Sequence, residues 1–493
     1  MCHFCAARCK YKGILLSYLI VRTKICERIA GRDFPPFVKR VIFTYFYVAL
    51  CAWLLIVVSV FFSPGLFRNF TCPRFGELFF TMIGPYLNSL YSHCPSLRKT
   101  PEYDETAVTT FFEGEVAMLL KKHNIQDEHA LLLMLTTTKY RDLEPFFQDF
   151  PILELFYLVN SLGEYQVSTE QLDVLGRLKF ESSVQMHTGI TENRVWKLMA
   201  DSIRMHTVLG RSFQITHQKS SFFLSHDIDS LYGSLLQDGA WALKSGRLDV
   251  LLRLFIQVLS AKPHWFNIDL VMKLESEYDF KSTFYWLVNK GRVDARQTNA
   301  DYTIQSKKVK QALDRVVGNG FENGLHKSIS PSSFGSELVK LPVAVHGNRY
   351  HYLKFQLPAA YSQLTQSGLK LDASLGFAEH YGFRNNYGYP FMPYDVSAKK
   401  QHTFLEVPLN IMDGTFQRYL KVQVEKTAET VIGFLEKHRQ DCLLSILWHN
   451  TFFTDYKYKG YRQEYIKILQ FLYEEKFTNI NQSGIIELFA WRK

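Results

Sequence analysis

Two carboxylates at the end of an apolar run are the residues of this sequence best suited to chemistry. Residues 221–230 read Ser-Phe-Phe-Leu-Ser-His-Asp-Ile-Asp-Ser, which places Asp227 and Asp229 two positions apart. In a strand such residues point to the same face, and parallel α/β folds place their chemistry at strand ends. Two like charges this close need a cation between them or a shared proton. The pattern indicates a metal site with an adjacent base, although a plain turn or helix cap after a strand also favours Asp.

Other polar residues also follow apolar or strand-like segments. His326 ends the run Gly-Leu-His and can offer a neutral imidazole to a metal, although a surface histidine is the simpler interpretation. Arg349 and His351 stand two positions apart and share a face if residues 349–355 form a strand. The guanidinium of Arg349 suits a carboxylate partner. His449 closes an apolar run laid out like the one before Asp227, so we expect it to face the same pocket.

The elements that must position these residues alternate along the chain. Residues 282–287 are β-branched and aromatic, which predicts a strand. Helical patterns cover about 230–259, the segment after Asn267 and residues 307–317, with Asn267 or Asp269 as the cap of the second. Strands that alternate with helices predict a parallel sheet or barrel. Residues 101–215 mix a helix (113–122), a strand or helix (152–159) and a further packed segment (195–205), which indicates a smaller mixed α/β accessory domain.

The charge of the chain is confined to its beginning. The formal net charge is +10, and the first 100 residues alone hold 13 Lys/Arg against 3 Asp/Glu. The remaining residues therefore balance, with 44 basic and 44 acidic side chains. A neutral body argues against a nucleic-acid-binding surface.

Residues 41–63 form an apolar run of 23 residues without a charge, long enough to span a bilayer. Nine Lys/Arg precede it in the basic segment 1–40, which predicts a cytoplasmic N-terminus with the body on the far side of the membrane. The alternatives are a buried core helix, or an N-terminal stretch unrelated to a cytoplasmic catalytic body. We expect a linker at 64–100, the accessory domain at 101–215 and a catalytic barrel at 216–493.

Six short runs, in order, resemble the polysaccharide deacetylase superfamily (carbohydrate esterase family four, NodB-like), in its bacterial form with an extra N-terminal domain. They are SHDID (225–229), STFYW (282–286), GLHKS (324–328), RYHYLKF (349–355), LDASLGFAEHYGFR (371–384) and ILWHN (446–450). The resemblance covers about residues 216–493. It implies a distorted (β/α) barrel with a divalent metal at its mouth, and an activity that removes N- or O-linked acetyl groups from sugars.

The resemblance also implies a role for each site residue. Asp227 corresponds to the catalytic base and Arg349 to the arginine that orients it. Asp229 and His326 correspond to metal ligands. His449 corresponds to the histidine that protonates the leaving group. The implied metal is zinc, with cobalt and nickel as alternatives.

One position departs from the family pattern. A second histidine is expected four residues after His326, where this chain has Ser330, a weak metal ligand. His351 stands where many members have proline and could supply the missing imidazole. The alternatives are a site completed by Ser330 or water, or a chain that has lost its metal. Arg384, in the run Gly-Phe-Arg, favours a structural ion pair over a substrate contact.

The sequence therefore predicts a metal-dependent hydrolase that deacetylates a polysaccharide or glycan precursor, tied to the membrane by residues 41–63. The alternative is a catalytically impaired barrel that serves as a glycan-binding or scaffold module. A two-carboxylate glycosidase fits less well, because Asp227 and Asp229 on one strand are too close for its geometries. The sugar, the acetyl position and the oligomeric state are not indicated.

Overall fold

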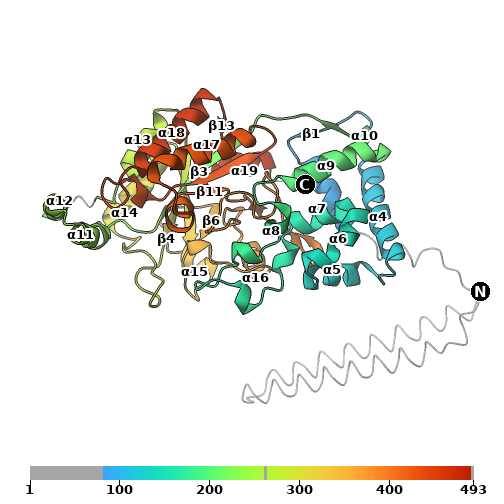
Figure 1. Ribbon diagram of the computed structural model, residues 1–493, viewed down its shortest axis with the longest axis horizontal. Helices are drawn as coiled ribbons and strands as arrows, with labels where there is room; N and C mark the ends of the chain where they lie inside the picture. Colours follow the sequence, from blue (N-terminus) through green and yellow to red (C-terminus); the bar gives the residue numbers. More distant parts are fainter. Residues whose placement is uncertain (1–81, 260–263, 490–493) are drawn as a thin grey trace, which may run out of the picture. The chain divides into compact units, whose positions relative to one another are not determined.

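The computed structural model describes residues 82–259 and 264–489 (Figure 1). The basic segment 1–40 and the apolar run 41–63 lie outside these residues, so the predicted membrane helix stays a prediction. Among the described helices, none combines the length and apolar character that a membrane span requires. Residues Phe79–Lys493 form one compact unit. The division expected near residue 216 falls inside this unit and also stays a prediction.

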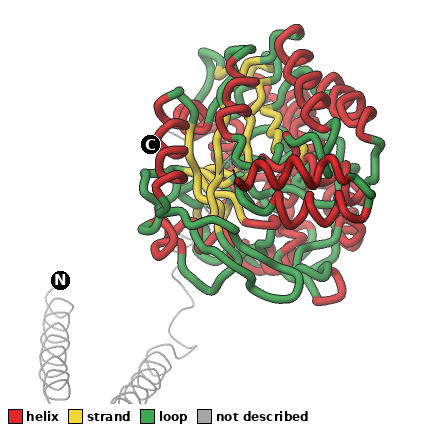
Figure 2. Tube along the Cα trace, turned by 90° about the vertical axis from the view of Figure 1, so that its left-hand side faces the viewer, coloured by secondary structure: helices red, strands yellow, loops and turns green. Residues whose placement is uncertain are grey.

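A nine-stranded sheet lies at the centre of residues 216–489, and every strand pair in it is parallel (Figure 2). The strand order is β10-β7-β6-β5-β4-β3-β12-β11, with β13 also beside β3. Because the end strands β10 and β11 are not paired with each other in the described chain, the sheet is a curled half-barrel. The parallel α/β class predicted from the alternation of elements is confirmed in this form. The strands are β3 (Ser221–Ile228), β4 (Ser282–Leu287), β5 (Glu322–Lys327), β6 (Gly347–Tyr350), β7 (Leu371–Asp372), β10 (Leu405–Glu406), β11 (Ile411–Met412), β12 (Leu443–Leu447) and β13 (Thr478–Asn479).

The central strands are buried on both faces, which is why they read as apolar runs rather than as alternating patterns. All six residues of β4 are buried, and its bounds match the strand predicted at 282–287. Helices cover the sheet. Helix α14, for example, buries Val309, Ala312, Leu313 and Val316, the spacing of one helical face. The helices of this part of the chain are α11 (Ser234–Lys244), α12 (Leu248–Leu259), α13 (Ile268–Ser276), α14 (Lys307–Gly318), α15 (Phe334–Leu338), α16 (Ala359–Ser367), α17 (Thr427–Lys437), α18 (Tyr461–Glu474) and α19 (Gln482–Phe489).

The segment before β3 is almost entirely helical, whereas the sequence suggested a mixture of helices and strands. Its only strands in the described chain are β1 (Leu97–Lys99) and β2 (Phe213–Ile215), which pair antiparallel. The sequence pattern did not decide whether residues 152–159 form a strand or a helix. They lie in a helix whose first turn contains a proline, a position at which proline is tolerated. The helices are α3 (Ile83–Ser92), α4 (Glu105–Lys122), α5 (Glu128–Thr137), α6 (Tyr140–Asp149), α7 (Pro151–Val159), α8 (Gln185–Thr188), α9 (Arg194–Met205) and α10 (Thr207–Ser212).

This helical segment packs on the sheet through buried polar contacts as well as apolar ones. Arg384 donates to both carboxylate oxygens of Glu164, at 3.0 and 2.7 Å, and its guanidinium lies over the ring of Phe355. The structural ion pair expected for Arg384 is therefore present. Helix α3 also packs into this core, so the stretch expected as a linker at 64–100 is ordered structure from residue 83 onward.

Candidate active site

The residues singled out from the sequence come from four strands that end at one edge of the sheet. Asp227 lies near the end of β3 and His326 near the end of β5, and β4 runs between these two strands. Arg349 on β6 is in register with His326. Parallel strands direct their carboxyl ends to the same side, which is why residues more than 200 positions apart in the chain meet here. Asp229 follows β3 directly, and His449 follows β12.

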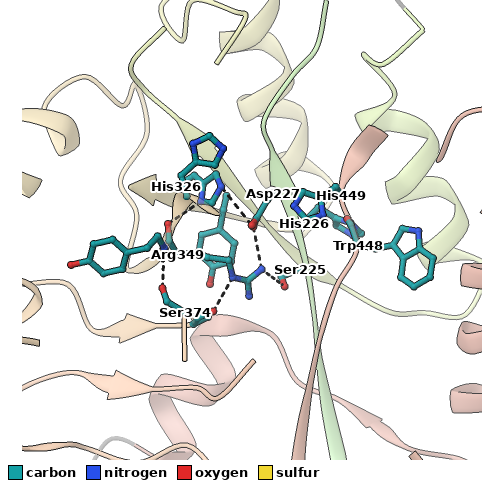
Figure 3. Close-up of polar contacts among 12 residues, drawn as sticks. Ser225, His226, Asp227, His326, Arg349, Ser374, Trp448 and His449 are labelled. Carbon is teal, nitrogen blue, oxygen red and sulfur yellow. Dashed lines mark hydrogen bonds and ion pairs between the residues drawn. The ribbon is translucent and has the colours of Figure 1, made fainter. Parts of the chain in front are cut away.

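Arg349 braces Asp227 from inside the sheet (Figure 3). Its Nη1 donates to Asp227 Oδ1 at 3.1 Å and to Ser225 Oγ at 2.9 Å. Its Nε donates to the carbonyl of Ala373 at 2.8 Å, and the guanidinium lies 4.8 Å from the centre of the Tyr285 ring. The Arg349 side chain is fully buried, and its contact holds Oδ1 of Asp227 in place, while Oδ2 lies 3.5 Å from His326 Nε2.

Asp229, His326 and His351 form a cluster of potential metal ligands. One ligand atom from each lies within 4.8 Å of the others. His326 Nε2 is 3.2 Å and His351 Nε2 is 3.5 Å from Asp229 Oδ1. Within the described chain this buried Asp229 oxygen accepts no hydrogen bond of good geometry. Buried carboxylate oxygens normally accept a hydrogen bond, and this one instead lies between two imidazole nitrogens. These three groups therefore fit the ligand set of a divalent metal.

His326 is oriented to offer its Nε2 lone pair. Its Nδ1 lies 2.9 Å from the carbonyl oxygen of Arg349, which can only accept, so Nδ1 carries the proton. Metal-binding histidines are commonly fixed by such a hydrogen bond from the second ring nitrogen. Burial acts to lower the pKa of His326, but the neighbouring Asp227 and Asp229 raise it overall. A bound cation would replace the proton that these carboxylates otherwise attract.

His351 reaches the cluster from a tight turn rather than from a strand. Strand β6 ends at Tyr350, and His351 opens a 3₁₀ turn in which Tyr352 and Leu353 have φ of 60° and 53°. The expectation that Arg349 and His351 share a face of one strand is therefore wrong. Positive φ at such residues is costly and persists where contacts fix it. Here Tyr352 stacks on His351 with ring centres 4.0 Å apart, and Arg177 donates to its carbonyl.

The protonation states suit these positions. Burial, together with the neighbouring His326 and His449, lowers the pKa of His351 to about 3, which leaves it a neutral imidazole. Burial alone would raise the pKa of Asp229, but the three surrounding imidazoles hold it below its usual range. An ionised carboxylate and a neutral imidazole are the forms that bind metals.

Ser330 is engaged elsewhere. Its hydroxyl accepts from Asn289 at 3.1 Å, donates to Glu337 at 3.2 Å and contacts Ser332 closely. The carboxylate of Glu337 is fully buried and also binds Lys327 at 2.6 Å, so this network has its own structural purpose. The geometry thus favours His351 over Ser330 as the third ligand.

His449 faces the cluster from the opposite side. Its Nε2 is 3.8 Å from Asp229 Oδ2, and its Nδ1 lies 2.7 Å from Asp413 Oδ1. The backbone N–H of His449 donates to the other oxygen of Asp413 at 2.6 Å, so the carboxylate fixes both the position and the tilt of the ring. Burial acts to lower the pKa of His449, but Asp413 and then Asp229 raise it to about 9. The ring is therefore protonated near neutral pH.

The side chains of the site differ in their exposure to solvent. The side chains of Asp227, His326 and His351 are 4%, 1% and 4% exposed. His449 and Asp229 are 18% and 34% exposed. Asp229 and His449 are therefore the members of the site that are most accessible to solvent.

Sequence reasoning missed two residues that hold this site together. Asp413 comes directly after the short strand β11, a layout like that of the residues around Asp227 and His449. The same signal could have found it. Ser225 was quoted only as part of a motif, and nothing in the sequence indicated that its hydroxyl would accept from Arg349. In the run 371–384, the carbonyl of Ala373 accepts from Arg349.

Comparisons with known proteins give limited information. No protein-family model matches the sequence, and no curated protein matches it. Among solved structures, the chain is similar to a protein from Mycobacterium smegmatis assigned as a polysaccharide deacetylase, at 12% identity and a TM-score of 0.35. This match covers 55% of the chain and 90% of that protein.

Two further matches have other descriptions. A CE4-family pseudoenzyme from Bacillus anthracis matches at 9% identity and a TM-score of 0.30, over 55% of the chain and 66% of that protein. A 4-alpha-glucanotransferase from Thermococcus litoralis matches at 11% identity and a TM-score of 0.35, over 56% of the chain and 41% of that protein. Scores this low carry no functional argument, so the residues of the pocket must support the assignment.

Proposed function

We propose that this protein is a metal-dependent hydrolase that removes acetyl groups from a polysaccharide or glycan precursor. One observation carries the proposal. Asp229, His326 and His351 present converging ligand atoms beside Asp227, which Arg349 holds in place, while His449 faces them from the other side. A set of two histidines and one carboxylate is typical of catalytic zinc, and cobalt or nickel would suit the same donors.

The three ligands would hold the ion, and a divalent ion there would supply a Lewis acid that polarises a carbonyl group and makes water a better nucleophile. Asp227 acts as the general base. Arg349 engages its Oδ1, so Oδ2 remains to take a proton from the attacking water. Arg349 itself keeps its proton and serves to position the carboxylate.

His449 acts as the general acid. Its Nδ1–H is directed at Asp413, so Nε2 is the nitrogen that faces the pocket and carries the transferable proton. Because its pKa is about 9, the ring is protonated at neutral pH and can give a proton to the departing amine or alcohol of the sugar. Base and acid thus approach the acetyl group from two different strands.

The proposal is tested with the purified full chain and acetylated sugar oligomers, by measuring bound metal and released acetate. We expect about one divalent ion per chain and acetate release that a chelator abolishes. Asp227→Asn should remove acetate release and keep the metal, whereas Asp455→Asn, a surface carboxylate paired with Arg462, should change neither. Acetate release that survives in Asp227→Asn would show that Asp227 is not the base.

The second candidate is an impaired barrel that binds glycans without cleaving them. The position of Ser330 favours it, because the usual second histidine is replaced by a hydroxyl held in another network. This alternative predicts that oligomers bind while the protein, even when supplied with zinc, cobalt or nickel, releases no acetate. Binding without release would decide in its favour.

A further inference from the structure

Two helices that follow the site expose an unusual amount of apolar surface. Helix α11 begins at Ser234, one short loop after Asp229, and α12 returns beside it at the edge of the molecule (Figure 1). We call α11 and α12 together the hairpin. Its exposed large apolar side chains are Leu235, Leu236, Leu243, Leu248, Leu252, Phe255, Ile256 and Leu259, with exposed fractions from 44% to 77%.

Helix α12 is apolar on two faces. Leu248, Leu252, Phe255, Ile256 and Leu259 recur at the spacing of one helical face and point outward. A surface helix normally turns one apolar face to the core and a polar one to water. Here the polar residues Asp249, Arg253 and Gln257 form only a narrow stripe. A contiguous exposed apolar patch of this kind marks an interaction site.

The inner face of the hairpin already has its partners. Val250 and Leu254 pack with Ala242 and Tyr456 in a small apolar cluster of their own. Trp265 donates from its indole nitrogen to the buried Asp238 at 2.7 Å and fixes α11 to the body. The apolar side chains of the outer face therefore do not belong to the core of the hairpin, and their exposure indicates that this face binds a partner.

We propose that the outer face of the hairpin docks in the surface of a lipid bilayer. Two observations select lipid. First, the patch consists of Leu, Ile and Phe beside the exposed cations Lys244 and Arg253, while Arg247 is paired with Asp249, and this is the composition of helices that lie in a membrane interface. Second, the chain before Met82 holds 81 residues, among them the uncharged run 41–63 that suits a membrane segment. Both features would hold the chain at the same surface.

The length of the helices determines how they would dock. Helix α12 has 12 residues, or about 18 Å of helix. A bilayer core is about 30 Å thick, so α12 is too short to cross it. The hairpin would instead lie in the plane of the interface with Leu252 and Phe255 inserted. Since α11 starts just after Asp229, docking brings the mouth of the site to the membrane surface.

The test uses the full chain with vesicles of phosphatidylethanolamine and phosphatidylglycerol that contain a diazirine phospholipid. After illumination, lipid adducts are mapped by mass spectrometry. We expect adducts on peptides from residues 234–259, and their loss in the variant L252E/F255E. Adducts on residues 41–63 serve as an internal comparison. The matched variant V339E/L488E alters two exposed apolar residues outside the hairpin and should leave the labelling of the hairpin unchanged.

Three outcomes would overturn docking in lipid. Vesicles could label residues 41–63 but not the hairpin. Sedimentation without lipid could instead reveal dimers that L252E/F255E dissociates, which would make a second copy the partner. Chemical cross-links between the hairpin and residues 41–63 in lipid-free protein would make that segment the cover. Acetate release from soluble oligomers should be equal in L252E/F255E and the unmodified chain, so the fate of this proposal is separate from that of the catalytic one.

Discussion

Asp413 holds His449 by two contacts, one to the ring and one to the backbone. The ring Nδ1 lies 2.7 Å from one carboxylate oxygen, and the backbone N–H donates to the other at 2.6 Å. The pair lies across the site from the ligand cluster. It gives His449 both its orientation and its raised pKa, so the acid function proposed for His449 depends on a residue that touches no substrate.

Replacing Asp413 with Asn should therefore damage catalysis and leave metal binding intact. The amide cannot accept from both the ring and the backbone N–H, so His449 loses its fixed tautomer and its negatively charged partner. We expect acetate release to fall on the order of 10⁴-fold, as when the carboxylate that orients a catalytic histidine is changed to an amide. Bound metal, measured by elemental analysis, should stay the same. Equal loss of metal and activity would indicate a general disturbance of the fold instead.

The third ligand can be identified by a pair of variants. His351→Ala should weaken metal affinity by more than about 100-fold, because it removes a direct ligand. Removal of a residue that only hydrogen-bonds a ligand costs roughly 10–100-fold. Ser330→Ala should retain metal, since its hydroxyl is committed to Asn289 and Glu337. Metal titration followed by elemental analysis measures both. If Ser330→Ala lost the metal and His351→Ala kept it, Ser330 would be the third ligand instead.

Arg349 should matter for stability as well as for catalysis. Arg349→Met leaves Asp227 buried without its cation, and breaking a buried ion pair on one side typically costs about 3–5 kcal/mol. The free energy of unfolding from urea titration is the measurement. Adding Asp227→Asn to Arg349→Met should recover part of the loss, because no charge then remains unpaired. A double variant as unstable as the sum of the two single ones would show that the pair is not coupled.

His438 should make the protein less stable in mild acid. Burial lowers the pKa of His438 to about 4, whereas an unfolded histidine titrates near 6.5. Between these values the unfolded chain binds the extra proton, so stability is full above pH 6.5 and falls as the pH drops toward 4. Between these two pH values, one such group changes the free energy of unfolding by about 1.4 kcal/mol per pH unit.

His438→Gln isolates this contribution. The glutamine amide can donate to the carbonyl of Thr191, as His438 Nε2 does at 2.9 Å, but it does not titrate. The difference in melting temperature between pH 7 and pH 5 should therefore be smaller in His438→Gln than in the unmodified chain. The exposed His129→Gln is the control and should keep the full difference. Equal slopes in all three proteins would exclude His438 as the origin.

The location of the site was predictable because it depends on where strands end. Asp227, His326 and His449 all follow or close apolar runs, and parallel pairing brings such ends to one edge of the sheet. Short buried strands leave a clear local signal, and β4 was placed to the residue. Asp413 carries the same signal after β11, but a two-residue strand is too short to stand out.

Other features depend on contacts that no local pattern encodes. His351 reaches the cluster because of a turn with two residues at positive φ, held by stacking and by Arg177 from a distant segment. The orientation of Ser330 follows from the buried carboxylate of Glu337. Residues 152–159 could be strand or helix by pattern, and packing against α9 selected the helix.

The side chains of the site become less exposed from Asp229 toward Asp227 and His326. Asp227 and His326 are at most 4% exposed, whereas Asp229 is 34% exposed. A group bound at the site would meet Asp229 first and would find Asp227 and His326 deeper in the protein. Under the function proposed above, a substituent that projects from a polymer would therefore reach these residues more readily than a linkage within the polymer itself.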